Sequence, residues 1–415
     1  MLMWLTISLR NIIKNGRRSL MTVLAIALGY AAINLFQGYV HSTYEDLSNA
    51  AIHGEGLGHF TIFKKSYLDQ GKLHPEKYQF SRAEVERISG IVRQEAGVTL
   101  VTPRLSVSGI LSNGKNSTIF IAEGLVPKDD VEIRGDLSKY TAFSGAYLDD
   151  KERTGVVLGA ELAQMLDLKV GSDAVVLSNT YSGMANALDV KVAGIYNTGS
   201  TATNDKMMLM TYRHAQDLID FPGAERLVVV LANGKNGKAL QTVMAGLEKR
   251  LAEAGFSVEM RTWSELSVFY RQVKNLFDMI FLFIFLIVLV IVVMSVVNTM
   301  SMSVMERTRE IGTLRALGLK RRGVKALFST EGALLGLLGS AAGFLIFFTV
   351  YGAITAAQPS YVPPGSSNPV PLQVDLVWPA LVRSVLSMTL LALVAAYVPA
   401  RRSARMTVVD ALGHI

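Results

Sequence analysis

The most constraining feature of this sequence is the apolar run from Met279 to Met294 (MIFLFIFLIVLVIVVM), which contains no charged side chain. A helix needs about 20 mostly apolar residues to cross the hydrocarbon core of a membrane. Several stretches meet this requirement, and only 18% of all residues are charged, against about 25% in soluble domains. We therefore expect a membrane protein with four transmembrane α-helices, at residues 19–40, 276–303, 326–351 and 376–400.

Positively charged side chains predict the orientation of these helices, because Lys and Arg accumulate on the cytoplasmic side of a membrane. They precede the first span, separate the second from the third and follow the fourth, whereas the connection 352–375 contains none. The positions are Arg10, Lys14, Arg17, Arg18, Arg307, Arg309, Arg315, Lys320, Arg321, Arg322, Lys325, Arg401, Arg402 and Arg405. We expect both termini, with the tail 401–415, in the cytoplasm. This topology accounts for the net charge of +7, so no nucleic-acid partner is expected.

The N-terminal region allows two interpretations. The first span could be the apolar core of a signal peptide, but its length of about 22 residues exceeds the usual 7–15. No clean cleavage site follows it, which favours a retained helix. Residues 1–18 alternate apolar and basic positions at roughly helical spacing, which indicates an amphipathic helix in the inner membrane interface.

Residues 41–263 have an ordinary soluble composition and lie outside the cell membrane in this topology. Strand-like segments mix with amphipathic helical ones, which predicts a large α+β domain inserted between helices 1 and 2. Its middle portion, about 125–200, interrupts two flanking strand–helix–strand halves, so we expect two subdomains. Ser81 followed by Glu84 predicts a capping box at one helix start.

The segment 264–303 passes from polar to apolar without Pro or Gly in its polar part. We expect the second span to continue outward as a rigid helical stalk, with a short break as the alternative.

Catalytic chemistry is not indicated. The chain has no cysteine, which excludes a thiolate metal site and a Cys nucleophile. It contains no phosphate-binding loop, and its six histidines are scattered without metal-ligand spacing. We expect a non-enzymatic chain with no catalytic residue, no metal and no cofactor of its own.

The cytoplasmic connection 304–325 combines charged residues with an apolar stripe at helical spacing. This pattern predicts a short docking helix for a protein partner; the alternative is that the charges only hold the connection inside. The candidate coupling residues are Glu306, Arg307, Arg309, Glu310, Leu314, Arg315, Leu317 and Gly318.

Small and polar residues mark the spans. Two small-xxx-small pairs in the third span allow helix backbones to approach closely, within the chain or in a dimer; they are Gly332, Gly336, Gly339 and Gly343. Polar side chains at membrane depth either form hydrogen bonds where they pack against other helices or face a cavity. The candidate cavity residues are Asn34, Gln37, Ser295 and Asn298. Arg383, near the outer end of the fourth span, is expected to reach the headgroups.

These features together resemble the permeases of the FtsX/MacB superfamily, the mechanotransmission type of ABC transporter. The resemblance rests on ERTREIGTLRALGLKRRGVKALFSTEGALLGLLGSAAG, on PARRSARMTVVDAL after the last span, and on the order of one span, a large domain and three spans. It covers essentially the whole chain. The segments VVLGAELAQMLDLKVGSDAVVL and VAGIYNTGSTATNDKMMLMTYRHAQDLI are most similar to the lipoprotein-releasing (Lol) permeases.

The resemblance implies partners. A separate cytosolic ATPase, in two copies, would bind ATP and Mg and grip the docking helix. A second permease chain, identical or homologous, would complete a central cavity within membrane lipid. A periplasmic carrier or adaptor would contact a loop whose matching residues are Asn179, Thr180, Tyr181, Ser182, Gly183 and Met184. This loop lacks the proline- and arginine-bearing hook of the carrier-binding permeases.

Three functions are compatible with the resemblance, all in a bacterial inner membrane. The first is extraction of lipoproteins or other lipid-anchored cargo, with ATP hydrolysis driving periplasmic conformational work. The second is a MacB-like permease in a tripartite efflux or export system for peptides, toxins or siderophores. The third is an FtsX-like regulator of a cell-wall hydrolase. Absence of an ATPase on the same chain favours the first over the second.

Overall fold

The structure is a computed structural model that describes residues 2–71, 74–135, 142–197, 204–232, 237–362 and 369–407. The chain forms two compact units. We call residues 1–44, 273–360 and 371–415 the helix bundle, and residues 45–272 and 361–370 the inserted domain.

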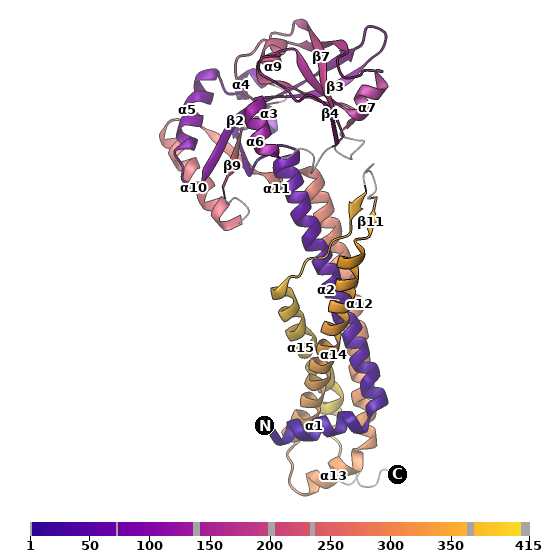
Figure 1. Ribbon diagram of the computed structural model, residues 1–415. Coiled ribbons are helices and arrows are strands. Elements are labelled where there is room, and N and C mark those ends of the chain that lie inside the picture. The colour runs from indigo at the N-terminus through magenta and orange to yellow at the C-terminus, as the bar shows by residue number, and fades with distance from the viewer. Residues whose placement is uncertain are drawn as a thin grey trace. The chain divides into compact units, whose positions relative to one another are not determined.

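Four helices in the described part of the chain are long and apolar enough to cross a membrane, which confirms the predicted spans (Figure 1). They are α2 (Gly16–Asn49), α12 (Val268–Glu306), α14 (Arg321–Ala357) and α15 (Trp378–Ser403). The amphipathic segment at the N-terminus forms α1 (Leu2–Lys14). The remaining elements are α13 (Thr308–Ala316) and the paired short strands β11 (Ser360–Tyr361) and β12 (Val370–Pro371).

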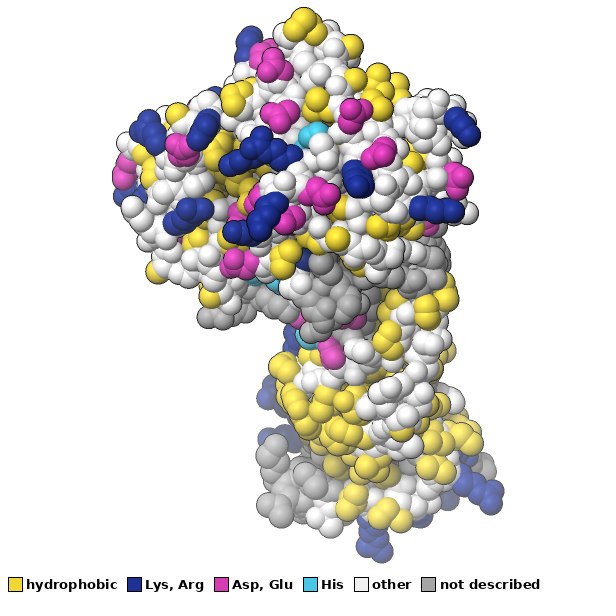
Figure 2. Space-filling model, turned by 45° about the horizontal axis from the view of Figure 1, so that its top comes forward, with side chains coloured by type: hydrophobic (Ala, Val, Ile, Leu, Met, Phe, Trp, Pro, Cys, Tyr) yellow, Lys and Arg dark blue, Asp and Glu magenta, His cyan; other side chains and the backbone are white. Residues whose placement is uncertain are grey.

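The helices of the bundle pack through aromatic and small side chains. α2 and α12 lie side by side, since the rings of Phe36 and Phe281 stack with centroids 6.3 Å apart. Nearer the N-terminus of α2, the hydroxyls of Thr22 and Thr299 are 2.6 Å apart. The face of the bundle in Figure 2 is covered by hydrophobic side chains, as expected where lipid or a second apolar surface replaces water.

All four helices extend beyond the predicted spans at one end or both. α2 continues past residue 40 to Asn49 and then as the π-helix η1 (Ala50–Gly54), because its polar extension contains no Pro or Gly before residue 54. α12 begins at Val268. Extended Ser267 (φ −70°, ψ 103°) separates it from α11 (Trp263–Leu266), so the helical stalk starts after a short break.

The inserted domain is built on one sheet in the order β10-β1-β9-β2-β3-β8-β5-β7-β4, with β6 pairing with both β2 and β7. Six of these strands therefore close into a hydrogen-bonded ring, β2-β3-β8-β5-β7-β6. The strands are β1 (Phe60–Lys64), β2 (Val98–Ser112), β3 (Ser117–Leu125), β4 (Ala142–Gly145), β5 (Gly155–Gly159), β6 (Asp173–Asn179), β7 (Ala185–Asn197), β8 (Met207–Thr211), β9 (Arg226–Leu231) and β10 (Val258–Thr262).

Helices cover this sheet and divide the domain into two main cores. The first core gathers β1, β9 and β10 with two long helices, and the second fills the strand ring with two short ones. Besides η1 and α11, the helices in the described part of the domain are α3 (Tyr67–Gln70), α4 (Pro75–Tyr78), α5 (Arg82–Arg93), α6 (Pro127–Arg134), α7 (Ala160–Met165), α9 (Tyr212–Ile219) and α10 (Gly237–Glu253). Ser81 and Glu84 form the predicted capping box of α5.

The long strand β2 belongs to both cores. Val101 is buried in the first core and Leu105 in the second. The second core therefore draws on residues 105–221, a wider range than the predicted 125–200, because β2 and β3 supply part of the ring. The structure thus has the expected fold class, four membrane-crossing helices with a large α+β domain between the first two.

Candidate functional site

The predicted docking helix lies at a sharp turn between two membrane-crossing helices. α12 ends at Glu306 and α13 begins at Thr308, so Arg307 alone connects them. Arg307 has φ −111° and ψ 14°, outside the helical range, and this turns the chain. We call residues 304–320 the elbow. Figure 1 shows α13 at the end of the bundle where α1 also lies.

Ion pairs hold the start of the elbow. Glu306 pairs with Arg18 of α2. Arg307 donates from Nε to Glu310 Oε2 at 2.9 Å and from Nη2 to Glu310 Oε1 at 3.2 Å. This bidentate hydrogen bond from Arg307 keeps the pKa of the Glu310 carboxyl below its usual value.

The predicted coupling residues divide between a solvent face and a packed face. Glu306, Arg309, Glu310 and Leu317 are exposed, whereas Arg307, Leu314 and Arg315 are half-buried. Ile311 packs into the core of the bundle. Arg315 donates a hydrogen bond to the backbone carbonyl of Met406, and Gly318, with φ +100°, ends α13. The elbow therefore presents charges and the 81% exposed Leu317 to solution while its other face is fixed.

The four glycines of the third span pack within the chain. A Cβ on Gly332 would lie 2.4 Å from Ala396 Cβ of α15. A Cβ on Gly336 would lie 2.8 Å from Thr389 Cα of the same helix. A Cβ on Gly339 would lie 2.6 Å from Ile26 Cβ, and Gly343 is equally close to α2. The first pair thus fits α14 to α15, and the second fits it to α2.

The four polar membrane residues have different surroundings. Asn34 is buried, donates to the Tyr30 carbonyl at 2.7 Å and accepts from Ser384 Oγ at 3.0 Å, so it is a packing residue. Ser295 Oγ lies 3.3 Å from Thr22 Oγ1. Asn298 is exposed on α12. Of the four, Gln37 lines a cavity.

This cavity of about 220 Å³ lies among α2, α12 and α15. Apolar groups and a few polar ones line it; the residues are Ile33, Gln37, Phe281, Phe285, Ala380, Arg383, Ser384, Ser387 and Met388. Arg383 thus contributes to a cavity in addition to the predicted reach toward the headgroups. Positive charge, hydroxyls and aromatic rings together suit a ligand with a polar head and an apolar tail.

The predicted partner loop connects β6 and β7 of the strand ring. Thr180 is buried and its hydroxyl accepts a hydrogen bond from Met184 N at 3.1 Å. The Tyr181 ring meets Phe221 edge to face at 5.1 Å, while Gly183 has φ +82°. Met184 is exposed. The loop is therefore a tight turn fixed on one side and open on the other.

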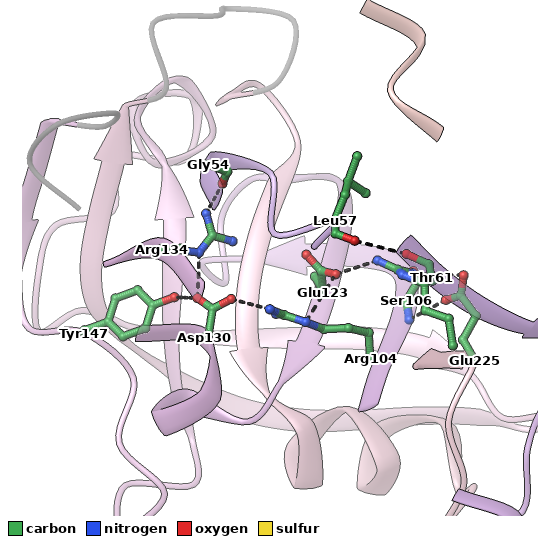
Figure 3. A network of polar contacts seen from close by, with 11 residues as sticks. Gly54, Leu57, Thr61, Arg104, Ser106, Glu123, Asp130, Arg134, Tyr147 and Glu225 are labelled. Atoms are coloured by element: carbon green, nitrogen blue, oxygen red, sulfur yellow. Dashed lines mark hydrogen bonds and ion pairs between the residues drawn. The ribbon is translucent and has the colours of Figure 1, made fainter. Parts of the chain in front are cut away.

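A buried network of charges crosses the inserted domain where the two cores meet, and the sequence did not predict it (Figure 3). Arg104 of β2, 1% exposed, and Arg134 of α6 both bond Asp130, at 2.5 Å and 2.6 Å. Tyr147 also donates to the Asp130 carboxylate. Burial alone would raise the pKa of Asp130, but the two guanidinium groups and the Tyr147 hydroxyl hold it far below its usual range.

The network continues along the strands. Arg226 Nη2 forms an ion pair with Glu123 Oε1 of β3 at 2.5 Å. The same carboxylate oxygen lies 3.9 Å from Arg104 Nε. Arg226 also pairs with Glu225, which accepts from the backbone N–H of Ser106 at 2.8 Å. Side chains from β2, β3, α6 and the start of β9 are thus joined by charge.

The same network contacts the end of η1. Arg134 donates a hydrogen bond to the Gly54 carbonyl, as Figure 3 shows. Gly56 has φ +70°, and a Cβ there would lie 3.3 Å from Arg104 Nη2. His53 Nδ1 lies 2.7 Å from the Ile133 carbonyl. The Gly54–Gly58 segment is therefore bound to α6 and β2.

Metal chemistry finds no support among the residues that the structure describes, since no group of three or more His, Asp or Glu side chains there could hold an ion. His41 instead pairs with Asp375 at 2.8 Å, and the backbone N–H of Leu231 donates to His59 Nδ1.

Four helices long and apolar enough to cross a membrane, with a large α+β domain inserted in sequence between the first two, define a multi-pass membrane protein. Residues 19–248 match the family of MacB-like periplasmic core domains, and residues 282–408 match the FtsX-like permease C-terminal family. The chain belongs to this FtsX/MacB type: it is an ABC transporter permease, the non-catalytic transmembrane subunit, and its inserted domain is periplasmic.

Curated relatives agree with this class. An uncharacterized ABC transporter permease of Methanocaldococcus jannaschii is 22% identical over 98% of this chain and 97% of its own length. The lipoprotein-releasing system transmembrane protein LolC of Neisseria meningitidis is 23% identical over 80% of this chain and 77% of its own. A macrolide export ATP-binding/permease protein MacB of Yersinia pestis is 33% identical over 28% of this chain and 16% of its own.

One solved structure is the periplasmic region of MacB from Actinobacillus actinomycetemcomitans. It is 15% identical and covers 52% of this chain and 92% of its own, with a TM-score of 0.36.

Proposed function

We propose that this permease extracts lipid-anchored cargo, such as lipoproteins, from the outer leaflet of the bacterial inner membrane, driven by a cytosolic ATPase. The observation that carries the proposal is the cavity among α2, α12 and α15, whose lining combines Arg383 and Gln37 with aromatic rings.

The dimensions of the cavity favour part of a lipid over a bulky solute. Its volume of about 220 Å³ is below the roughly 300–1,000 Å³ of sites for drug-sized ligands. The stacked rings of Phe281 and Phe285, 6.5 Å apart, offer an apolar wall to an acyl chain. Arg383 and Ser387 offer hydrogen bonds to ester or amide carbonyls at its head.

The elbow is the surface through which the ATPase would act on the permease. An ABC transporter permease works with an ATP-binding partner, and this sequence contains no phosphate-binding loop of its own. In the proposed topology both termini and α13 are cytoplasmic, and two ATPase copies bind ATP and Mg. Leu317 and the exposed charges Arg309 and Glu310 form the surface that one copy would grip.

A second permease chain, identical or homologous, completes the proposed transporter. The support is the face of α12 that carries large exposed apolar side chains, which suits another helix as well as lipid. These side chains are Met279, Leu282, Phe283, Leu286, Ile287, Val290, Ile291 and Met294.

A periplasmic carrier or adaptor would receive the cargo at the β6–β7 turn. Met184 in the turn is exposed, and Leu177 on β6 lies opposite Ile110 of β2, which lies opposite Ile119 of β3. These three strand residues are exposed apolar side chains on neighbouring strands of a soluble domain, a feature typical of a protein-binding surface.

Export of macrolides, siderophores or peptides into an outer-membrane duct is the second candidate. It is favoured by the MacB-like core domain at residues 19–248 and by the similarity to a MacB protein.

Reconstitution distinguishes the two functions. The permease is purified with its ATPase, and what co-purifies is identified by mass spectrometry; acylated proteins support lipid-anchored cargo, and soluble peptides or macrolides alone overturn it. In proteoliposomes we expect Arg383→Leu and Phe281→Ala to reduce lipoprotein release. Leu386→Ala, on the exposed face of α15, is the matched control and should release normally. Equal release by all variants would contradict the role of the cavity.

A further inference from the structure

The side chain of Arg307 lies between two carboxylates that belong to different helices. Glu310 on α13 receives its bidentate hydrogen bond, and Glu331 on α14 lies with Oε2 at 3.6 Å from Arg307 Nη1. The distance of 3.6 Å is that of an ion pair beyond ordinary hydrogen-bond length. Of these two carboxylates, Glu331 is the one on a membrane-crossing helix, so it connects the elbow to α14 through this arginine.

Glu331 is buried in the bundle. Its side chain is 3% exposed, whereas carboxylates are almost never this buried without a partner. The side chains of Ser303 on α12 and Asn11 on α1 also lie near its carboxyl group. One turn earlier on α14, the Phe328 ring lies 5.8 Å from the guanidinium carbon of Arg307. Four elements therefore converge on this pair of charges.

Glu331 lies beside the glycines through which α14 packs against its neighbouring helices. Gly332, the next residue, packs against Ala396 of α15, and Gly339 packs against Ile26 of α2. α14 is thus fitted closely to both neighbours, and Glu331 is the side chain by which it holds the elbow. A rotation of α13 about Arg307 would act on α14 through this ion pair.

We propose that Glu331 is a positioning residue, which fixes the orientation of α13 through Arg307 and passes movement of α13 to α14. The proposal rests on the function of the elbow proposed above. Glu331 itself is turned away from solution and does not contact the ATPase; it acts through Arg307. The Arg307–Glu331 pair is buried, and separating the two side chains would leave a buried charge without its partner, which is strongly unfavourable.

The first test measures the position of α13 without any ATPase. The chain has no cysteine, so Ala316→Cys and Arg402→Cys introduce one spin label on α13 and one at the end of α15. Pulsed electron resonance then gives the distance distribution in lipid nanodiscs. We expect Glu331→Gln, which keeps size but removes charge, to broaden or shift this distribution. Ser340→Ala, another buried polar residue of α14, is the control and should leave it unchanged.

The second test measures coupling in the complex with the ATPase. A coupling energy of ordinary size corresponds to about a tenfold effect, so Glu331→Gln should lower cargo-stimulated ATP hydrolysis about tenfold. Because Glu331 acts through Arg307, the double variant should give the same loss as Arg307→Gln alone, which also removes the hydrogen bonds to Glu310. Rescue by Glu331→Asp is expected, since it restores the charge. If Glu331→Gln does not insert, Arg307→Gln carries both tests.

The outcomes separate the two proposals. An unchanged distance distribution in Glu331→Gln, or losses that add in the double variant, would overturn the positioning role. A changed distribution combined with ATPase stimulation that no elbow variant affects would support the positioning role and overturn the docking function of the elbow.

Discussion

Arg134 donates a hydrogen bond to the backbone carbonyl of Gly54, the last residue of the π-helix that continues α2. The last carbonyls of a helix lack partners within the helix, and a buried guanidinium group supplies one here. The same side chain bonds Asp130 at 2.6 Å. Within the inserted domain, the end of η1 is therefore tied directly to the charge network.

We expect Arg134→Gln to lower the free energy of unfolding of the inserted domain by about 3 kcal/mol, because Asp130 loses one of its two cations in a buried site. Trp263 reports on this domain once Trp4 and Trp378 are replaced by Phe, since the chain has three tryptophans. Urea unfolding of the full chain in detergent gives the difference.

The control for this measurement is Arg82→Gln. Arg82 pairs with Glu86 at 3.1 Å, but both side chains are largely exposed. Such pairs contribute about 0.3–0.5 kcal/mol. Similar losses for Arg134→Gln and Arg82→Gln would show that the network is not stabilising.

Asp130 predicts how this stability depends on pH. Its folded pKa is far below its unfolded value of about 4, because Arg134 and Arg104 outweigh the effect of burial. A carboxyl with a depressed pKa contributes stability above its unfolded pKa and loses it as pH falls toward the folded pKa. We expect wild type to lose more stability than Asp130→Asn between about pH 5 and pH 2. Parallel pH curves for the two proteins would refute this.

The membrane spans, the short helix α13 and the capping box of α5 could be predicted because each depends on neighbours in sequence. Apolar length, charge asymmetry and the Ser81–Glu84 spacing are local signals. The elbow was placed correctly between α12 and α14, since its apolar positions recur at helical spacing.

The charge network could not be predicted from the same information. Arg104, Asp130 and Arg134 are residue types that usually lie on the surface, and only the pairing of β2 with β3 and the position of α6 bring them together. Glu331 was missed for a related reason. It stands between polar residues and the glycines of α14, and its partner Arg307 is distant in sequence.

The exposed charges of the elbow allow a test of docking. We expect Glu306→Lys combined with Glu310→Lys to abolish cargo-dependent stimulation of the ATPase while the permease still inserts. The reason is that two acidic side chains on the surface that the ATPase is proposed to contact become basic. ATP hydrolysis by the reconstituted complex measures this. Glu86→Lys combined with Glu253→Lys makes the same charge change on α5 and α10 and should leave stimulation unaltered. Full stimulation in the elbow variant would remove docking from this helix.

Gly339 and Gly352 of α14 form a matched pair that tests close packing. A Cβ on Gly339 would lie 2.6 Å from Ile26 Cβ, whereas a Cβ on Gly352 would meet nothing within 4 Å. We expect Gly339→Ala to cost about 2 kcal/mol through overpacking and Gly352→Ala to gain up to about 1 kcal/mol from helix propensity. Denaturation in mixed micelles, followed by Trp378 fluorescence, compares the two. Loss of stability in both variants would point to a general sensitivity of α14, while tolerance of Gly339→Ala would mean that α2 and α14 separate easily.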